Sequence, residues 1–265
     1  MTVSVKSILF CGAALAASYN AQAHVPYLNP ASFEPARGGW VSLDAAFADR
    51  FFLPEAVFDN SQFVVRTPAG EQLPLQQVHY GQTRATAEHK VEQDGTYRFS
   101  TGLRYGAVFH TYEQNGERKN SRDPAFVLPE GAKSLAHFQA VTRAETYVSK
   151  GAPDQAAVAA TNEALELAFL SHPNDLYSDS TVRAKVLFNG KPLAQQEVKL
   201  YQIVKGADDE KVTAALNSDS AGVISFNPQQ PGTYFLVSRY RTDAPTTAAV
   251  PTYSYTYSVV LEVTE

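Results

Sequence analysis

The stretch of sequence that decides the fold is VRAKVLFNG, residues 182–190. Every second residue from Val182 to Phe188 is apolar, and Asn189-Gly190 follows at once. Alternation of this kind is typical of a strand with one buried face. The Asn-Gly step favours a two-residue hairpin, because both residues tolerate positive φ. The stretch therefore predicts a strand that ends in a tight turn.

The same pattern recurs along the chain, whereas helical periodicity is nearly absent. Alternating runs occupy residues 41–47 and 85–92, and glycine turns stand at Asp94-Gly95, Asn115-Gly116 and Pro231-Gly232. Short strands separated by such turns indicate sandwiches rather than a parallel α/β sheet. We therefore predict an all-β protein made of immunoglobulin-like, Greek-key β-sandwiches.

An internal echo predicts two such sandwiches in tandem. Residues 93–99 read QDGTYRF and residues 230–236 read QPGTYFL, which places Tyr97 and Tyr234 at matching positions after a glycine turn. In Greek-key sandwiches a tyrosine there often donates its hydroxyl to nearby backbone, as in a tyrosine corner. The domains are expected at residues 24–150 and 163–265, with a linker at 151–162. This organisation predicts that no sheet crosses the linker.

The first 23 residues are expected to be a cleaved signal peptide. Lys6 precedes an apolar run of ten residues, 8–17, and the segment closes on Ala21-Gln22-Ala23, a pattern that signal peptidase recognises. The run is shorter than the roughly 20 residues that span a bilayer. We therefore expect a periplasmic protein with no membrane anchor after cleavage.

Composition narrows the chemistry of the mature chain. The only Cys and the only Met lie in the expected signal peptide, so no disulfide, thiolate or thioether remains. Loss of Lys6 leaves 21 basic residues against 27 acidic ones, 21 − 27 = −6. This charge argues against nucleic acid or anionic lipid as a partner.

Catalytic motifs are missing from the sequence. It contains no Gly-x-Ser-x-Gly, no Ser-x-x-Lys and no phosphate-binding loop, the short motifs typical of hydrolases and nucleotide enzymes. We therefore expect a binding protein rather than an enzyme, with no organic cofactor. Tyr253, Tyr255 and Tyr257 alternate along one strand, which predicts either a covered sandwich face or a surface that stacks on carbohydrate.

Six histidines remain after cleavage, and His24 differs from the others because it becomes the first residue. Its free α-amine and its ring Nδ1 could together chelate one divalent ion, with a third nitrogen from His110 or His172. Asp175 is a candidate oxygen ligand beside His172. Imidazole and carboxylate suit Ni(II), Co(II), Cu(II) or Zn(II). His89 and His137 are expected to be core or edge histidines, and His79 to face solvent.

Four stretches in order carry a resemblance to a known family. They are the His after the signal, GWVSLDAA at 39–46, RAETYV at 143–148 and HPNDLY at 172–177. Together they resemble an exported family catalogued as a domain of unknown function, whose members are described as periplasmic components of cobalt or nickel uptake. Residues 188–234 also resemble carboxypeptidase-regulatory-like sandwiches, a likeness that implies fold alone.

The resemblance implies a periplasmic accessory that binds or delivers a divalent metal such as nickel or cobalt. Its partners would be the metal ion and an outer-membrane receptor or a permease. The alternative is a periplasmic β-sandwich module for protein interaction or carbohydrate binding, without metal.

Overall fold

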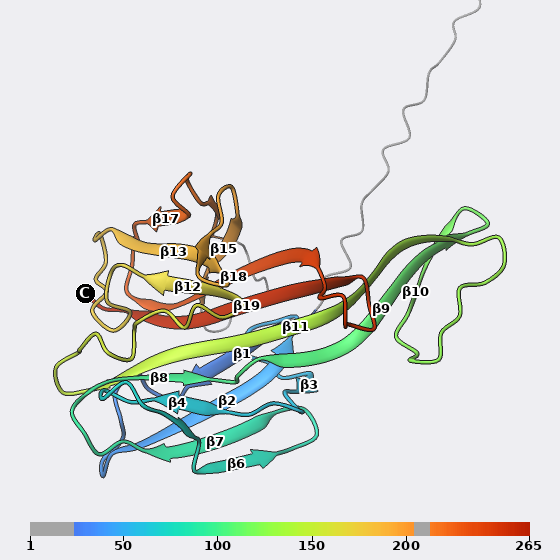
Figure 1. Cartoon of the computed structure of the whole chain (residues 1–265). Coiled ribbons are helices and arrows are strands. Elements are labelled where there is room, and N and C mark those ends of the chain that lie inside the picture. The colour runs from blue at the N-terminus through green and yellow to red at the C-terminus, as the bar shows by residue number, and fades with distance from the viewer. Residues whose placement is uncertain (1–23, 204–212) are drawn as a thin grey trace, which may run out of the picture.

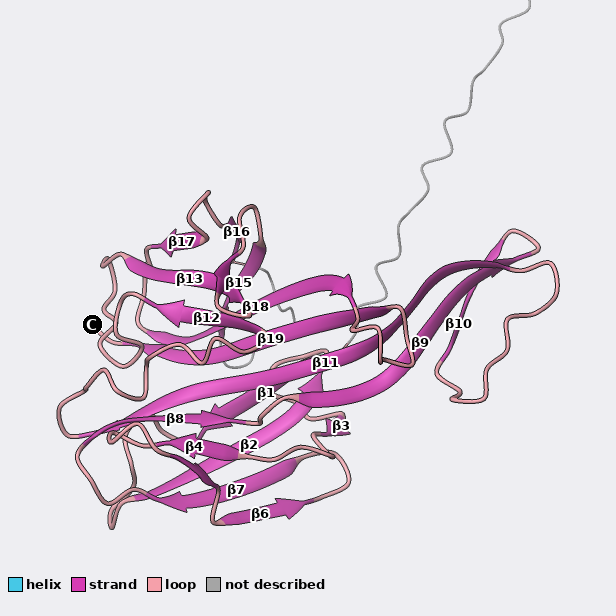
Figure 2. Ribbon diagram, in the orientation of Figure 1, coloured by secondary structure: helices cyan, strands magenta, loops and turns pink. Residues whose placement is uncertain are grey.

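The structure, a computed structural model, describes residues 24–203 and 213–265. Across these ranges it consists of strands and connecting loops without any helix, as Figure 2 shows. The all-β prediction is therefore confirmed. The described part of the chain has no helix that could span a membrane. The expected signal peptide, residues 1–23, lies outside the described residues.

The strands form three sheets. The N-terminal sheet has five strands: β1 (Val25–Pro30), β2 (Trp40–Ala48), β3 (Ala56–Val57), β6 (Gln77–Tyr80) and β7 (Ala85–Lys90). The C-terminal sheet has four: β12 (Leu165–Phe169), β13 (Val182–Phe188), β14 (Lys191–Pro192) and β17 (Val223–Phe226). The central sheet has ten: β4 (Val64–Arg66), β5 (Gln72–Pro74), β8 (Gly95–Ser100), β9 (Arg104–Gln114), β10 (Glu117–Ser121), β11 (Lys133–Lys150), β15 (Glu197–Ile203), β16 (Ala214–Asn217), β18 (Gly232–Asp243) and β19 (Thr252–Val263).

The central sheet buries both of its faces, because successive side chains of a strand point to opposite sides. Ala144 and Val148 of β11 pack into a core with the N-terminal sheet. Tyr147, on the opposite face of the same strand, belongs to the core shared with the C-terminal sheet. The two smaller sheets therefore cover opposite faces of one central sheet, each making a sandwich with it (Figure 1).

One expectation about these sandwiches is wrong, since a sheet does cross from the N-terminal to the C-terminal half. β11 pairs in parallel with β19, from Phe138 opposite Thr252 to Thr146 opposite Val260. β8 and β9 pair with one edge of β11 only, so its second edge is available to another strand. A strand edge left open would expose a row of unpaired backbone groups, and β19 fills it. Alternation in the sequence predicts strands but not their partners.

The bounds of the two domains stay a prediction, although the segment 151–162 contains no strand. Ala157 and Val158 of this segment are buried. The segment therefore packs against the sheets that it connects.

A long arm extends from this layered body (Figure 1). It is formed by β9, β10 and the first half of β11. Asn115 and Gly116 close the β9–β10 hairpin with φ of 55° and 78°, which confirms the turn predicted from the Asn-Gly step.

The two tyrosine corners are confirmed. The Tyr97 hydroxyl donates to the carbonyl oxygen of Gln93 at 2.9 Å, and the Tyr234 hydroxyl donates to that of Gln230 at 2.8 Å. Both tyrosines are buried. The same corner thus fixes the start of β8 in one half and of β18 in the other.

Removing either corner hydroxyl is expected to destabilise the whole protein. Each Tyr→Phe change leaves a partly buried backbone carbonyl, that of Gln93 or of Gln230, without its hydrogen-bond donor. This should lower the free energy of unfolding by about 1–3 kcal/mol. Urea unfolding followed by circular dichroism measures the loss. Tyr105→Phe, at a side chain that is 52% exposed, is the control and should change little; an equal loss there would contradict the role of the corners.

Candidate metal centre

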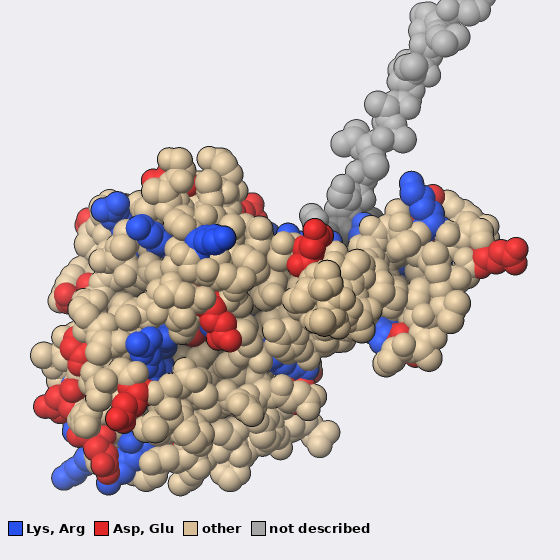
Figure 3. All heavy atoms as spheres, in the orientation of Figure 1, with Lys and Arg blue, Asp and Glu red and all other residues tan. Residues whose placement is uncertain are grey.

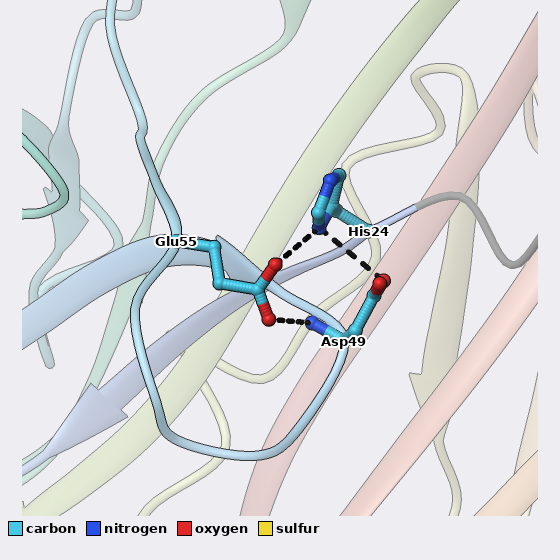
Figure 4. A group of neighbouring side chains, drawn as sticks. All are labelled: His24, Asp49 and Glu55. Carbon is cyan, nitrogen blue, oxygen red and sulfur yellow. Dashed lines mark hydrogen bonds and ion pairs between the residues drawn. The ribbon is translucent and has the colours of Figure 1, made fainter.

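Three side chains meet at the start of β1 (Figure 4). The Nδ1 atom of His24 lies 3.2 Å from Oδ1 of Asp49 and 3.2 Å from Oε2 of Glu55. One ligand atom from each residue falls within 4.8 Å of the other two. This is the group among the described residues that could hold a metal ion with at least three protein ligands.

Strand pairing explains why these residues meet. β1 pairs antiparallel with β2, with Val25 opposite Ala48, so the preceding and following residues, His24 and Asp49, also face each other. β3 pairs with the other edge of β2, with Ala56 opposite Phe47. Glu55 is thereby brought beside Asp49, whose backbone N–H donates to Glu55 Oε1 at 3.2 Å. The group therefore forms at the end of β2, where β1 and β3 pair with its two edges.

Aromatic packing anchors the loop between the two carboxylates. Phe51 lies edge-on to Phe235, with ring centroids 4.5 Å apart, and also contacts Tyr201. Phe52 packs on Tyr27 at 4.9 Å. These contacts join the loop to the core between β1, β2 and the central sheet. Asp49 and Glu55 therefore stand on an anchored loop, which lowers the entropy cost of binding an ion between them.

The donor atoms are suited to a borderline divalent cation. His24 Nδ1 and Asp49 Oδ1 are shielded from solvent yet have no hydrogen-bond partner, because their short contact lacks hydrogen-bond geometry. The side chains as a whole remain 37%, 45% and 41% exposed for His24, Asp49 and Glu55. One imidazole nitrogen with carboxylate oxygens suits Zn(II), Ni(II), Co(II) or Cu(II). The residues present therefore fit such an ion.

A basic side chain lies within electrostatic reach of the same group. Loss of hydration lowers the pKa of Arg239, and Tyr201 and Asp49 oppose that shift. Arg239 thus partly balances the charge of Asp49.

His172 is not part of this group, and both of its ring nitrogens are occupied. Nε2 lies 2.7 Å from the carbonyl oxygen of Asp154, which can only accept, so Nε2 carries the proton. Nδ1 accepts the backbone N–H of Asn174 at 3.1 Å. Asn174 in turn donates to the carbonyl of Tyr147. Through Asn174, His172 thus links the segment 151–162 to the end of β11, which is a structural role.

His110 also lies outside the His24 group, on the projecting arm. It stands directly opposite His137 across β9 and β11, with ring centroids 4.0 Å apart and planes 26° from parallel. Phe126 packs on its ring, and the three residues line a cavity of about 220 Å³. His110 therefore lies beside His137 and not beside His24, with which the sequence analysis expected it to bind a metal.

Two further histidines lie where the sequence analysis expected them. His89 on β7 is buried, and burial lowers its pKa below 6.5. His79 on β6 is exposed.

The carboxylates of the site were missed by sequence reasoning. Asp49 directly follows the alternating stretch that became β2, and Glu55 precedes β3. Pairing β1 with β2 as neighbours would have placed Asp49 beside His24. Glu55 offered no such signal, because its position depends on how the loop with Phe51 and Phe52 folds back.

The fold and this group define a layered β-sandwich protein with a histidine–carboxylate cluster at the beginning of its first strand. The model of one family, described as "Domain of unknown function (DUF4198)", matches residues 21–242. The chain therefore belongs to this family. His24, Asp49 and Glu55 all lie inside the matched region.

The chain has low similarity to several solved structures. The chain is similar to the D0-D1 domain of Intimin, with 12% identity, coverage of 88% of this chain and 96% of that chain, and a TM-score of 0.21. It is also similar to a marsupial T cell receptor, with 7% identity, coverage of 89% and 73%, and a TM-score of 0.22. No curated protein sequence matches the chain.

The pKa of His137 on the arm should depend on the neighbouring His110. Burial lowers the pKa of His137 below 6.5, and the neighbouring charge of His110 lowers it further. His110→Gln removes the second cause alone, so the pKa of His137 should rise part of the way back. Imidazole C–H signals in an NMR titration report it, with His79→Gln as the control. A His137 pKa that is unchanged in His110→Gln would contradict the coupling.

Proposed function

We propose that this protein is a periplasmic metal-handling accessory that binds a divalent transition ion through His24, Asp49 and Glu55. The observation that carries the proposal is the Nδ1 atom of His24, shielded and without a hydrogen bond, 3.2 Å from one oxygen of each carboxylate. Shielding a polar atom from water without giving it a hydrogen bond costs free energy. A metal ion held by the same atoms would remove that cost.

Processing after Ala23 would add a fourth ligand. The α-amine of His24 and its ring Nδ1 can then chelate one ion, and Asp49 and Glu55 supply oxygens. In this proposal the carboxylates take the place that the sequence analysis gave to His110 or His172. Signal-peptide cleavage is therefore a condition for full affinity.

The exposure of the site suits delivery rather than storage. All three side chains are more than a third exposed, so a partner could reach the ion and exchange ligands with it. A role in nickel or cobalt uptake, with an outer-membrane receptor or a permease as that partner, agrees with the family resemblance. We propose a binding protein and not an enzyme. The likeness of the C-terminal half to carboxypeptidase-regulatory-like sandwiches concerns fold alone.

The alternative function, carbohydrate binding without metal, has one observation in its favour. Tyr105 is exposed and lies next to Tyr253, with ring centroids 5.6 Å apart. The two rings meet edge-on, and Tyr255 packs against Phe188 of the C-terminal sheet. Tyr257 is completely buried. These tyrosines cover a sandwich face more than they offer a flat stacking surface.

Removing a ligand of the site should weaken metal binding by at least tenfold. Titration calorimetry with Ni(II), Co(II), Cu(II) and Zn(II) is carried out on protein that starts at His24. Asp49→Asn and Glu55→Gln each lose one anionic oxygen, and a form that keeps Met before His24 displaces the amine. Affinity should follow the Irving–Williams order, with Cu(II) tightest. It should fall below about pH 6, where imidazole ordinarily takes up its proton.

The matched control is Glu117→Gln, at an exposed carboxylate on the arm with the same change of charge. It should bind as the unchanged protein does. The proposal fails if the processed protein binds none of the four ions. It also fails if Glu117→Gln weakens binding as much as Glu55→Gln, because the effect would then be one of net charge.

A further inference from the structure

A second polar site lies on the face of the central sheet that looks toward the C-terminal half. A hollow of about 400 Å³ opens there over β4, β8 and β11 and is bordered by Thr161 and Glu163. Figure 3 shows basic and acidic side chains gathered around a hollow in this part of the surface. None of the three residues of the candidate metal centre lines it. The hollow is therefore a separate feature of the molecule.

Three arginines from adjacent strands line the hollow: Arg66 of β4, Arg98 of β8 and Arg143 of β11. Arg66 and Arg98 stand directly opposite each other in the strand register. Like charges in that relation destabilise a sheet. Arg98 and Arg143 are only 4% exposed, so water screens them little. Such an arrangement costs stability unless negative charge compensates it.

The protein supplies only part of that compensation. Glu145, 2% exposed, lies 3.7 Å from the Nε of Arg143 and accepts the Tyr257 hydroxyl at 2.7 Å. Arg98 and Arg143 hold the pKa of Glu145 below its usual value despite its burial. Glu163 lies 3.7 Å from Arg143, but it is 65% exposed. Among the residues that line the hollow, one buried carboxylate, that of Glu145, thus faces two buried guanidinium groups, and the half-buried Arg66 adds a third.

Another carboxylate of this region, that of Glu166, is already hydrogen-bonded within the protein. Glu166 accepts the backbone N–H groups of Thr161 and Asn162 and the hydroxyl of Thr161. Its oxygens are therefore held at the turn before β12 and are not among the groups that line the hollow.

The guanidinium groups of Arg66 and Arg98 are held in place with donor capacity to spare, whereas Arg143 already donates to the carbonyl oxygens of Glu163 and Leu165. Arg66 and Arg98 each donate one Nη1–H to the same carbonyl oxygen, that of Ala159, at 3.1 and 3.3 Å. A guanidinium group has five N–H donors in a planar fork that matches a carboxylate or phosphate. The side-chain amides of Asn60 and Gln62 add donors at the rim.

We propose that this hollow binds a small oxyanion, a carboxylate or a phosphate, through Arg66 and Arg98. A bound anion would offset the repulsion between the two opposed arginines. Charge-assisted, bidentate contacts of this kind are about twice as strong as neutral hydrogen bonds. The proposal is independent of the metal site, since the two share no residue.

Calorimetric titration of the processed, metal-free protein with inorganic phosphate and with succinate tests the proposal, at ionic strength held constant with chloride. We expect saturable binding of at least one of the two, and the tighter one identifies the natural chemistry. Arg66→Gln should weaken binding by at least tenfold. Arg66→Lys keeps the charge but loses the fork, so it should also weaken binding, by a smaller factor.

The matched control is Arg84→Gln, at an arginine that is 53% exposed and paired with Asp44 at the N-terminal sheet. It should leave anion affinity unchanged. Absence of saturable binding by both anions overturns the proposal and leaves the arginines a purely structural role around Ala159. Equal weakening in Arg66→Gln and Arg84→Gln overturns it as well. If Arg66→Gln does not fold, the comparison of Arg66→Lys with Arg84→Gln decides in the same way.

Discussion

Strand β11 is hydrogen-bonded along both edges, to β8 and β9 on one side and to β19 on the other. Its two faces are buried as well: Val148 contributes to the N-terminal core and Tyr147 to the C-terminal core. The rest of the structure depends on this strand, because β11 contributes side chains to the cores of both sandwiches. A change that disrupts the pairing of β11 with β19 would therefore affect both cores and not one domain.

The same constraint positions the candidate metal centre. β1 begins the N-terminal sheet, yet it is tied to the central sheet, since the Ser258 hydroxyl of β19 donates to the carbonyl of Pro26 at 2.6 Å. His24 therefore stands at the start of a strand that is held by both sheets. Phe51 and Phe52 fix the loop opposite through the core that the two sheets share. The site is thus built where the layers meet, although its three residues come from the first part of the chain.

Local features of the fold could be predicted from the sequence, and non-local ones could not. The Asn115-Gly116 turn and the corners at Tyr97 and Tyr234 follow from backbone preferences within a few residues. The parallel pairing of β11 with β19 joins segments more than a hundred positions apart, and alternation carries no information about that choice. The candidate site divides in the same way. His24 was identified from its own chemistry, whereas Glu55 became its neighbour through a loop that folds back.

We propose that a metal ion binds at the start of β1 and is held there by His24, as the first residue after cleavage. Anomalous diffraction from crystals of the protein that starts at His24, soaked with Zn(II), tests it most directly. A peak is expected about 2.0–2.1 Å from His24 Nδ1 and from the α-amine, with Asp49 and Glu55 completing the site. A peak only at His110 and His137, or no peak in the described part of the chain, would contradict it.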